Sequence, residues 1–132
     1  MANVLIVEDD PDTLEISTEV LEAAGHQVRK GANGEEGLDS LSVGPHPDCL
    51  LLDVDMPVLS GPGMAHRMLM HDAGQENIPI LLVSGREDLA ELARRMGTPY
   101  FLSKGSHEYG KMLLEILDRA LRERRAPSPA AV

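Results

Sequence analysis

Residues 48–53 read DCLLLD, an apolar run that ends abruptly on a carboxylate. A run this short, apolar throughout instead of alternating with polar residues, is typical of a strand buried on both faces of a sheet. Sheets with such strands are parallel, and helices cover both of their faces. The run therefore predicts an interior parallel strand over residues 48–52, with Asp53 directly after its carboxyl end.

The sequence on either side of this strand alternates between similar apolar runs and helix-like segments. We expect further strands at residues 4–7, 27–30, 80–83 and 100–102. We expect helices at about residues 11–24, 34–42, 64–73, 87–96 and 106–125, with the Pro- and Gly-rich residues 56–63 as a loop. Asp10 before Pro11 is a good N-cap for the first helix. The alternation predicts an α/β fold with a doubly wound parallel sheet.

Length and composition limit the possible classes of protein. A chain of 132 residues fits one domain. The formal net charge of −10 argues against nucleic acid binding, which relies on basic side chains. The single cysteine, Cys49, excludes an intramolecular disulfide and suits a reducing compartment. We see no basic leader and no apolar stretch near the ~20 residues that span a bilayer, so we expect a cytoplasmic protein without membrane contact.

Polar side chains follow the predicted strands at the points where the strands end. Glu8, Asp9 and Asp10 follow the first strand, Asp53 the third and Ser84 the fourth, and Lys104 comes two residues after the fifth. In open α/β sheets, ligands bind beyond the carboxyl ends of the strands. We therefore expect these side chains to meet at one edge of the sheet.

The chemistry of this group suits a phosphoryl group and a divalent cation. Clustered carboxylates repel one another and raise one another's pKa unless a cation lies between them. Oxygen ligands of this kind suit Mg²⁺, which takes one or two carboxylates plus phosphate oxygens. A hydroxyl and an ammonium opposite the carboxylates suit the remaining oxygens of the phosphoryl group. Asp10 is expected to act as the helix cap, with direct metal contact as the alternative.

Over about residues 2–122 the sequence resembles the receiver domain of two-component response regulators. The matching pieces are VLIVEDD at 4–10, LLLDVDMP at 50–57 followed by Gly61, LLVSG at 81–85 and FLSK at 101–104. Their order and spacing together carry the resemblance. It implies a flavodoxin-like (βα)5 fold with strand order 2-1-3-4-5, a receiver domain at residues 1–125, and a flexible tail or linker start at 126–132.

The resemblance also implies roles at the sheet edge. Asp53 would accept the phosphoryl group, and Glu8, Asp9 and Asp53 would hold Mg²⁺ or Mn²⁺ with the backbone carbonyl of Asp55. Lys104 would contact the phosphoryl group. Such a protein is a phosphoacceptor with at most weak self-catalysed phosphorylation and autodephosphorylation, not an enzyme.

Further roles concern the switch and the lifetime of the phosphoryl group. Ser84 would be the switch hydroxyl and Phe101 the switch aromatic, although the adjacent Tyr100 could compete for that role. Asp55 and Arg86 occupy the two positions that control hydrolytic water in the family, and we hypothesise that Arg86 shields the phosphoryl group. Gly105 replaces the proline that usually follows the lysine, so we expect a trans peptide or a rearranged loop there.

The implied partners are a sensor histidine kinase or a histidine phosphotransfer protein, and a downstream protein target or effector domain. The wide apolar face of the last helix predicts a phosphorylation-promoted homodimer. Two other functions stay open. One is a degenerate receiver that acts as a constitutive interaction module, which Gly105 alone supports. The other is a phosphotransferase of haloacid-dehalogenase type, for which Asp53 and Asp55 have the right spacing.

Overall fold

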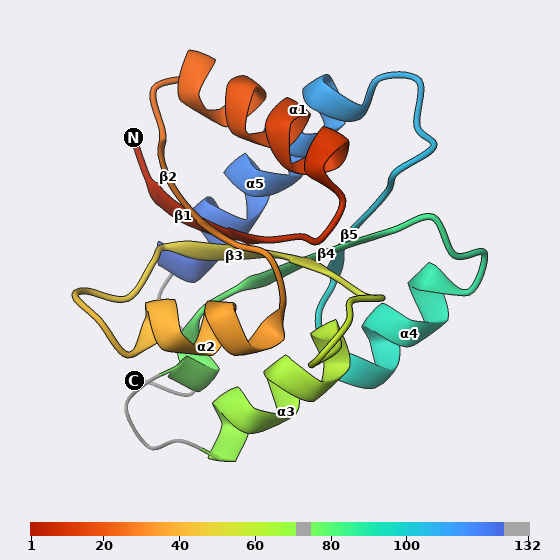
Figure 1. Ribbon diagram of the computed structural model, residues 1–132. Coiled ribbons are helices and arrows are strands. Elements are labelled where there is room, and N and C mark those ends of the chain that lie inside the picture. Colours follow the sequence, from red (N-terminus) through yellow and green to blue (C-terminus); the bar gives the residue numbers. More distant parts are fainter. Residues whose placement is uncertain (71–74, 126–132) are drawn as a thin grey trace.

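Five parallel strands form one sheet in the order β2-β1-β3-β4-β5 in the computed structural model of the protein, shown in Figure 1. The structure describes residues 1–70 and 75–125, except for the side chains of Glu76 and Arg125. The strands are β1 (Asn3–Val7), β2 (Gln27–Gly31), β3 (Cys49–Asp53), β4 (Ile80–Ser84) and β5 (Tyr100–Ser103). The predicted flavodoxin-like (βα)5 fold and its strand order are confirmed.

Helices cover both faces of this sheet. α1 and α5 pack on one face, and α2, α3 and α4 pack on the other (Figure 1). They are α1 (Pro11–Ala23), α2 (Gly34–Leu41), α3 (Gly61–Met70), α4 (Leu89–Met96) and α5 (Tyr109–Arg125), with a short 3₁₀ turn at Gln75–Asn77. Every residue of β3 is buried, as expected for a central strand between two helical layers.

The start of α3 corrects the sequence prediction. The prediction that residues 56–63 form a loop is wrong for residues 61–63, which are the first turn of the helix. Proline fits the first turn of a helix because the amide hydrogen that it lacks has no partner there. Ser60 precedes this turn, and its hydroxyl accepts a hydrogen bond from the Gly63 amide at 3.1 Å. The predicted end of this helix, at residue 73, lies outside the described residues.

Other boundaries differ by one to three residues. β3 covers residues 49–53, one residue later than predicted, so that Asp53 ends the strand. α4 begins at Leu89 and α5 at Tyr109, two and three residues later than predicted. Asp10 caps α1 as predicted, because its carboxylate accepts the Thr13 amide hydrogen at 3.2 Å. The tail at residues 126–132 lies outside the described residues.

Candidate functional site

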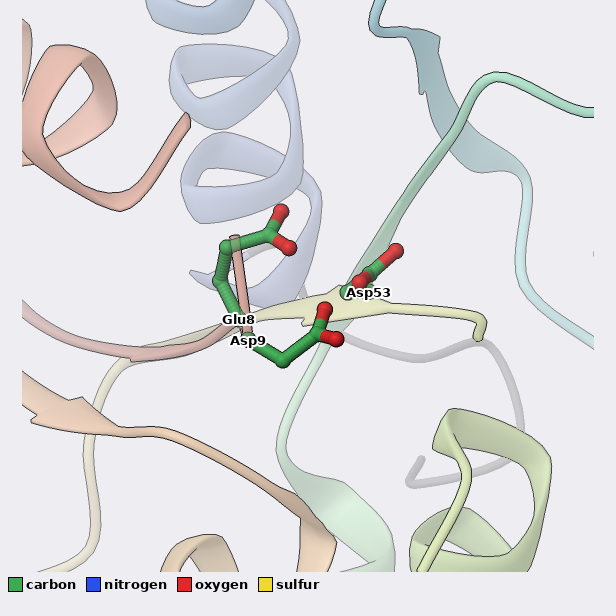
Figure 2. Close-up of side chains that lie close together, drawn as sticks. All are labelled: Glu8, Asp9 and Asp53. Atoms are coloured by element: carbon green, nitrogen blue, oxygen red, sulfur yellow. The ribbon is translucent and has the colours of Figure 1, made fainter. Parts of the chain in front are cut away.

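Three carboxylates from two neighbouring strands gather at one edge of the sheet. β1 and β3 pair in parallel with Val7 opposite Leu52, so the residues that follow this pair lie side by side. Oxygen atoms of Glu8, Asp9 and Asp53 all lie within 4.8 Å of one another. Figure 2 shows the three side chains together at the end of β3. Glu8 and Asp53 are buried and Asp9 is exposed, so the cluster is open to solvent on one side.

Lys104 supplies the positive charge of this site. Its Nζ lies 3.0 Å from Glu8 Oε2 and 3.3 Å from Asp53 Oδ1. Its backbone amide donates to the Ser84 carbonyl at 3.0 Å, which fixes the loop after β5 against the end of β4. Burial opposes the charge on this ammonium, but Glu8 and Asp53 prevail and raise the pKa of Lys104. The structure thus places Lys104 in contact with the acidic residues, as the sequence predicted.

The electrostatics of Asp53 favour a cation beside it. The pKa of Asp53 is raised to about 8, mainly by burial and then by the neighbouring carboxyl groups of Glu8 and Asp9. The positive charge of Lys104 acts in the opposite direction. Asp53 Oδ2 is buried and has no hydrogen-bond partner among the described residues. A buried carboxylate oxygen without a partner is costly. A divalent cation held by these carboxylates would satisfy it, so the donor set fits Mg²⁺.

Ser84 lies on β4, which is next to β3, and Phe101 lies on β5, which is next to β4. Asp53 pairs with Val83 in β4, which puts the buried Ser84 one residue beyond Asp53 at the same edge. The Ser84 hydroxyl accepts the Arg86 amide hydrogen at 3.0 Å. Phe101 is 40% exposed, whereas the adjacent Tyr100 is buried and donates its hydroxyl hydrogen to Glu123. Phe101, and not Tyr100, is therefore the aromatic residue whose side chain is exposed to solvent.

Arg86 lies at the rim of the site and is held by two carboxylates. Its Nη1 lies 3.2 Å from Asp55 Oδ1. Its Nε and Nη2 donate to the two carboxylate oxygens of Asp88 at 2.8 and 3.0 Å. The Arg86 side chain thus extends from the loop after β4 to Asp55, near the position where it was predicted to shield the phosphoryl group. In this structure its guanidinium binds Asp55 and Asp88. The pairing with Asp88 had no signal in the sequence, because residues two apart in a loop have no fixed geometry.

Gly61 is a second feature whose reason emerges only from the structure. A Cβ at this position would overlap the backbone carbonyl of Asp53. The Gly61 amide donates to the Val54 carbonyl at 2.9 Å, so the start of α3 is pressed onto the end of β3. The glycine is thus needed for a close approach of two backbones beside Asp53.

The loop after Lys104 has the expected backbone. No cis peptide bond occurs in the part of the chain that the structure describes, and the Lys104–Gly105 bond is trans as anticipated. The Gly105 amide donates to the Ser103 hydroxyl at 3.3 Å. The ammonium of Lys104 reaches Asp53 all the same. Gly105 therefore does not displace the lysine.

Comparisons with known proteins agree with this geometry. Residues 4–116 match the family described as the response regulator receiver domain. The chain is 35% identical to protein PilH of Pseudomonas aeruginosa over 123 residues. This alignment covers 92% of this chain and 98% of PilH. The receiver domain of a signal transduction histidine kinase from Syntrophus aciditrophicus superposes with a TM-score of 0.82 at 26% identity, over 98% of this chain and 96% of that one. Chemotaxis protein CheY4 of Vibrio cholerae gives 0.80 at 27% identity, over 92% and 99%.

The chain belongs to the response regulator receiver domain family. It is a signalling protein of the two-component type, a phosphoacceptor and not a conventional enzyme, which decides against the phosphotransferase alternative. Its acidic cluster is typical of the Mg²⁺ site of receiver domains, and membership implies a histidine kinase as partner. Among the described residues, no helix is both long and apolar enough to cross a lipid bilayer.

Proposed function

We propose that Asp53 accepts a phosphoryl group from a histidine kinase or a histidine phosphotransfer protein. One Asp53 oxygen attacks phosphorus, the bond from phosphorus to the donor nitrogen breaks, and the imidazole leaves with the electron pair. The observation that carries this proposal is the buried Asp53 carboxylate, which has Lys104 Nζ at 3.3 Å and one oxygen without a protein partner.

Glu8, Asp9, Asp53 and the backbone carbonyl of Asp55 would hold the metal. Bound there, Mg²⁺ or Mn²⁺ would neutralise charge on the transferred group and help to orient it. Lys104 binds another oxygen of the phosphoryl group, and its present contacts with Glu8 and Asp53 place its ammonium beside the attacking carboxylate. The lysine would therefore offset negative charge on the transferred group from its position beside Glu8 and Asp53.

Movements of Ser84 and Phe101 would convert phosphorylation of Asp53 into a change of the protein surface. The new dianion attracts the Ser84 hydroxyl, which now accepts a hydrogen bond from the Arg86 amide. Phe101 then turns into the space that is released. Phe101 lines a groove of about 540 Å³ together with Leu89, Ala90 and Met112, so its movement changes the surface formed by α4, β5 and α5. A downstream protein target or effector domain would read this surface.

Asp55 and Arg86 would set the lifetime of the phosphoryl group. Asp55 is exposed beside Asp53, and Arg86 contacts it from the loop after β4. A guanidinium that swings inward would cover the phosphorus from attacking water. The replacement of Arg86 by alanine should shorten the lifetime of the acyl phosphate, and equal lifetimes would contradict this role.

The decisive test is incubation with acetyl phosphate and Mg²⁺, followed by intact mass measurement. The expected result is one added phosphoryl group in the wild type and none in Asp53→Asn. Asp9→Asn should need more Mg²⁺ for the same extent of reaction. A protein that gains no phosphoryl group from acetyl phosphate or from a phosphorylated histidine protein would instead be the degenerate, constitutive interaction module.

A further inference from the structure

The start of α4 departs from the other two helices that begin after Asp or Asn. Asp10 and Asn33 have extended backbones, and their side chains accept amide hydrogens from Thr13 and Glu36. Asp88 is the residue before α4, but its φ and ψ are −90° and 17° and its side chain makes no capping hydrogen bond. The first turn of α4 thus lacks the side-chain cap that α1 and α2 possess.

Both groups that could cap α4 are bound to arginines instead. Asp88 and Glu91 have the spacing of a capping box, in which each side chain accepts the other's backbone amide hydrogen. Both Asp88 oxygens accept from Arg86, at 2.8 and 3.0 Å. The Glu91 carboxylate accepts from Arg94 and Arg95. The two side chains that a capping box would use are thus held by guanidinium groups, and the backbone of Asp88 is not extended.

Arg86 connects this uncapped helix to the site of phosphorylation. Its guanidinium also contacts Asp55, two residues after Asp53, and its amide donates to the Ser84 hydroxyl. A phosphoryl dianion on Asp53 would carry more charge than the single carboxylate of Asp88. Charge-assisted bonds from arginine to phosphate oxygens are also strong and geometrically favourable. The dianion can thus compete with Asp88 for the same guanidinium.

We propose that Asp88 is a positioning residue for Arg86: it holds the guanidinium away from Asp53, and it caps α4 when the phosphoryl group draws Arg86 inward. This inference rests on the proposed function, because it needs a phosphoryl group at Asp53. Leu89 and Ala90, in the first turn of α4, line the groove beside Phe101. Capping would therefore order one wall of that groove at the moment when Phe101 moves.

Amide hydrogen exchange by NMR tests the cap without any phosphoryl group. A capping Asp88 would accept from the amide of Ala90 or Glu91, at the second and third helical positions. Arg86→Ala frees Asp88, and Asp88→Asn keeps a capping oxygen but loses the ion pair. Both variants should protect Ala90 or Glu91 about fivefold more than the wild type, the scale of a side-chain cap, whereas Asp88→Ala should not. The amides of Thr13 and Glu36 serve as internal controls. Unchanged exchange in both Arg86→Ala and Asp88→Asn would overturn the inference.

Beryllofluoride with Mg²⁺, a mimic of the phosphoryl group, tests the exchange of partners. On binding, the wild type should gain the same protection at Ala90 or Glu91, and Arg86→Ala should gain nothing more. Bound mimic with no gain in the wild type would refute the exchange. The proposed function would instead be refuted if intact mass showed no phosphoryl group on Asp53 after incubation with acetyl phosphate. Failure of the inference and failure of the proposed function are therefore distinguishable.

A kinetic measurement separates positioning from a purely structural role. Asp88→Ala releases Arg86 toward the site, so its acyl phosphate should hydrolyse about threefold more slowly than that of the wild type, the scale of an exposed ion pair. The double variant with Arg86→Ala should hydrolyse as fast as Arg86→Ala alone, because Asp88 acts through Arg86. Equal rates in Asp88→Ala and the wild type would contradict the positioning role.

Discussion

Lys104 and Asp53 form an ion pair across the carboxyl edge of the sheet, with Nζ and Oδ1 3.3 Å apart. Lys104 follows β5 and Asp53 ends β3, and these strands are not neighbours, because β4 lies between them. The Lys104 amide binds the Ser84 carbonyl at the end of β4 and so directs the lysine side chain across that strand. The lysine is therefore positioned before any phosphoryl group arrives.

Replacing Lys104 by alanine should slow phosphorylation by acetyl phosphate. The preorganised ammonium would be missing from the transition state, and the loss of one such group typically reduces a rate by about 100-fold. The rate is measured by intact mass over time at saturating Mg²⁺. Lys111→Ala is the matched control, because Lys111 is exposed on α5 and its loss changes the net charge equally. Equal rates in Lys104→Ala and Lys111→Ala would show that the ion pair has no kinetic role.

The metal-free protein should lose stability as the pH rises from about 4 to 8. The pKa of Asp53 is raised from 3.8 to about 8, chiefly by burial and by Glu8. Over this range the folded state binds a proton that the unfolded state has released, so the free energy of unfolding falls with pH. Urea unfolding with a chelator at pH 5 and pH 8 measures the effect.

Two comparisons separate Asp53 from other titrating groups in that experiment. Asp53→Asn should raise the free energy of unfolding at pH 8 by about 1–3 kcal/mol, because it removes a buried charge that has an unsatisfied oxygen. Saturating Mg²⁺ should stabilise the wild type at pH 8 far more than Asp53→Asn, since a ligand that binds only the folded state stabilises it. A wild type and an Asp53→Asn variant with the same pH dependence would contradict this assignment.

Gly61→Ala should be destabilising by more than about 2 kcal/mol. The added Cβ overlaps the Asp53 carbonyl oxygen, which belongs to the backbone and cannot turn aside. Gly85→Ala is the control, because a Cβ at Gly85 meets no atom within 4 Å, and it should change stability by no more than about 0.5 kcal/mol. Thermal or urea unfolding measures both. A small effect of Gly61→Ala would mean that α3 can shift away from β3.

The strands and the acidic site that the sequence predicted share one physical origin. Buried parallel strands are recognisable as short apolar runs, and their carboxyl ends must meet at one edge of the sheet. The positions of Glu8, Asp53 and Lys104 follow from this rule alone, and the structure brings them together. The N-cap role of Asp10 was also predictable, because that interaction is local.

The features that the sequence did not predict depend on competition between partners. Residues 61–63 contain Gly-Pro-Gly, which reads as a loop, but the contact with β3 and the Ser60 cap make them the first turn of α3. α4 begins later than predicted, at Leu89, and Asp88 binds Arg86 instead of capping the helix. Local sequence gives a list of possible partners for Asp88, but only the folded loop decides among them.

The surface formed by α4, β5 and α5 should drive self-association of the phosphorylated protein. Phe101 and Met112 are 40% and 38% exposed there, beside the groove of about 540 Å³. Phosphorylation turns Phe101 inward, so Met112 is the exposed side chain that a second copy would cover. Because only 38% of Met112 is exposed, covering it would gain about 0.6–1.2 kcal/mol, or roughly a three- to eightfold change in affinity. Sedimentation velocity should show larger species with beryllofluoride and Mg²⁺ than without.

Two variants place this association on the surface around Phe101. Met112→Ala should weaken it by about three- to eightfold, because Met112 lines the groove beside Phe101 and its exposed part would be covered in the dimer. Ile16→Ala is the control, since Ile16 is 51% exposed but lies on α1, which contributes no residue to the groove. Its dimer should form as in the wild type. Equal sedimentation of the phosphorylated and unphosphorylated wild type would reject the prediction, and equal loss in both variants would move the contact away from Phe101.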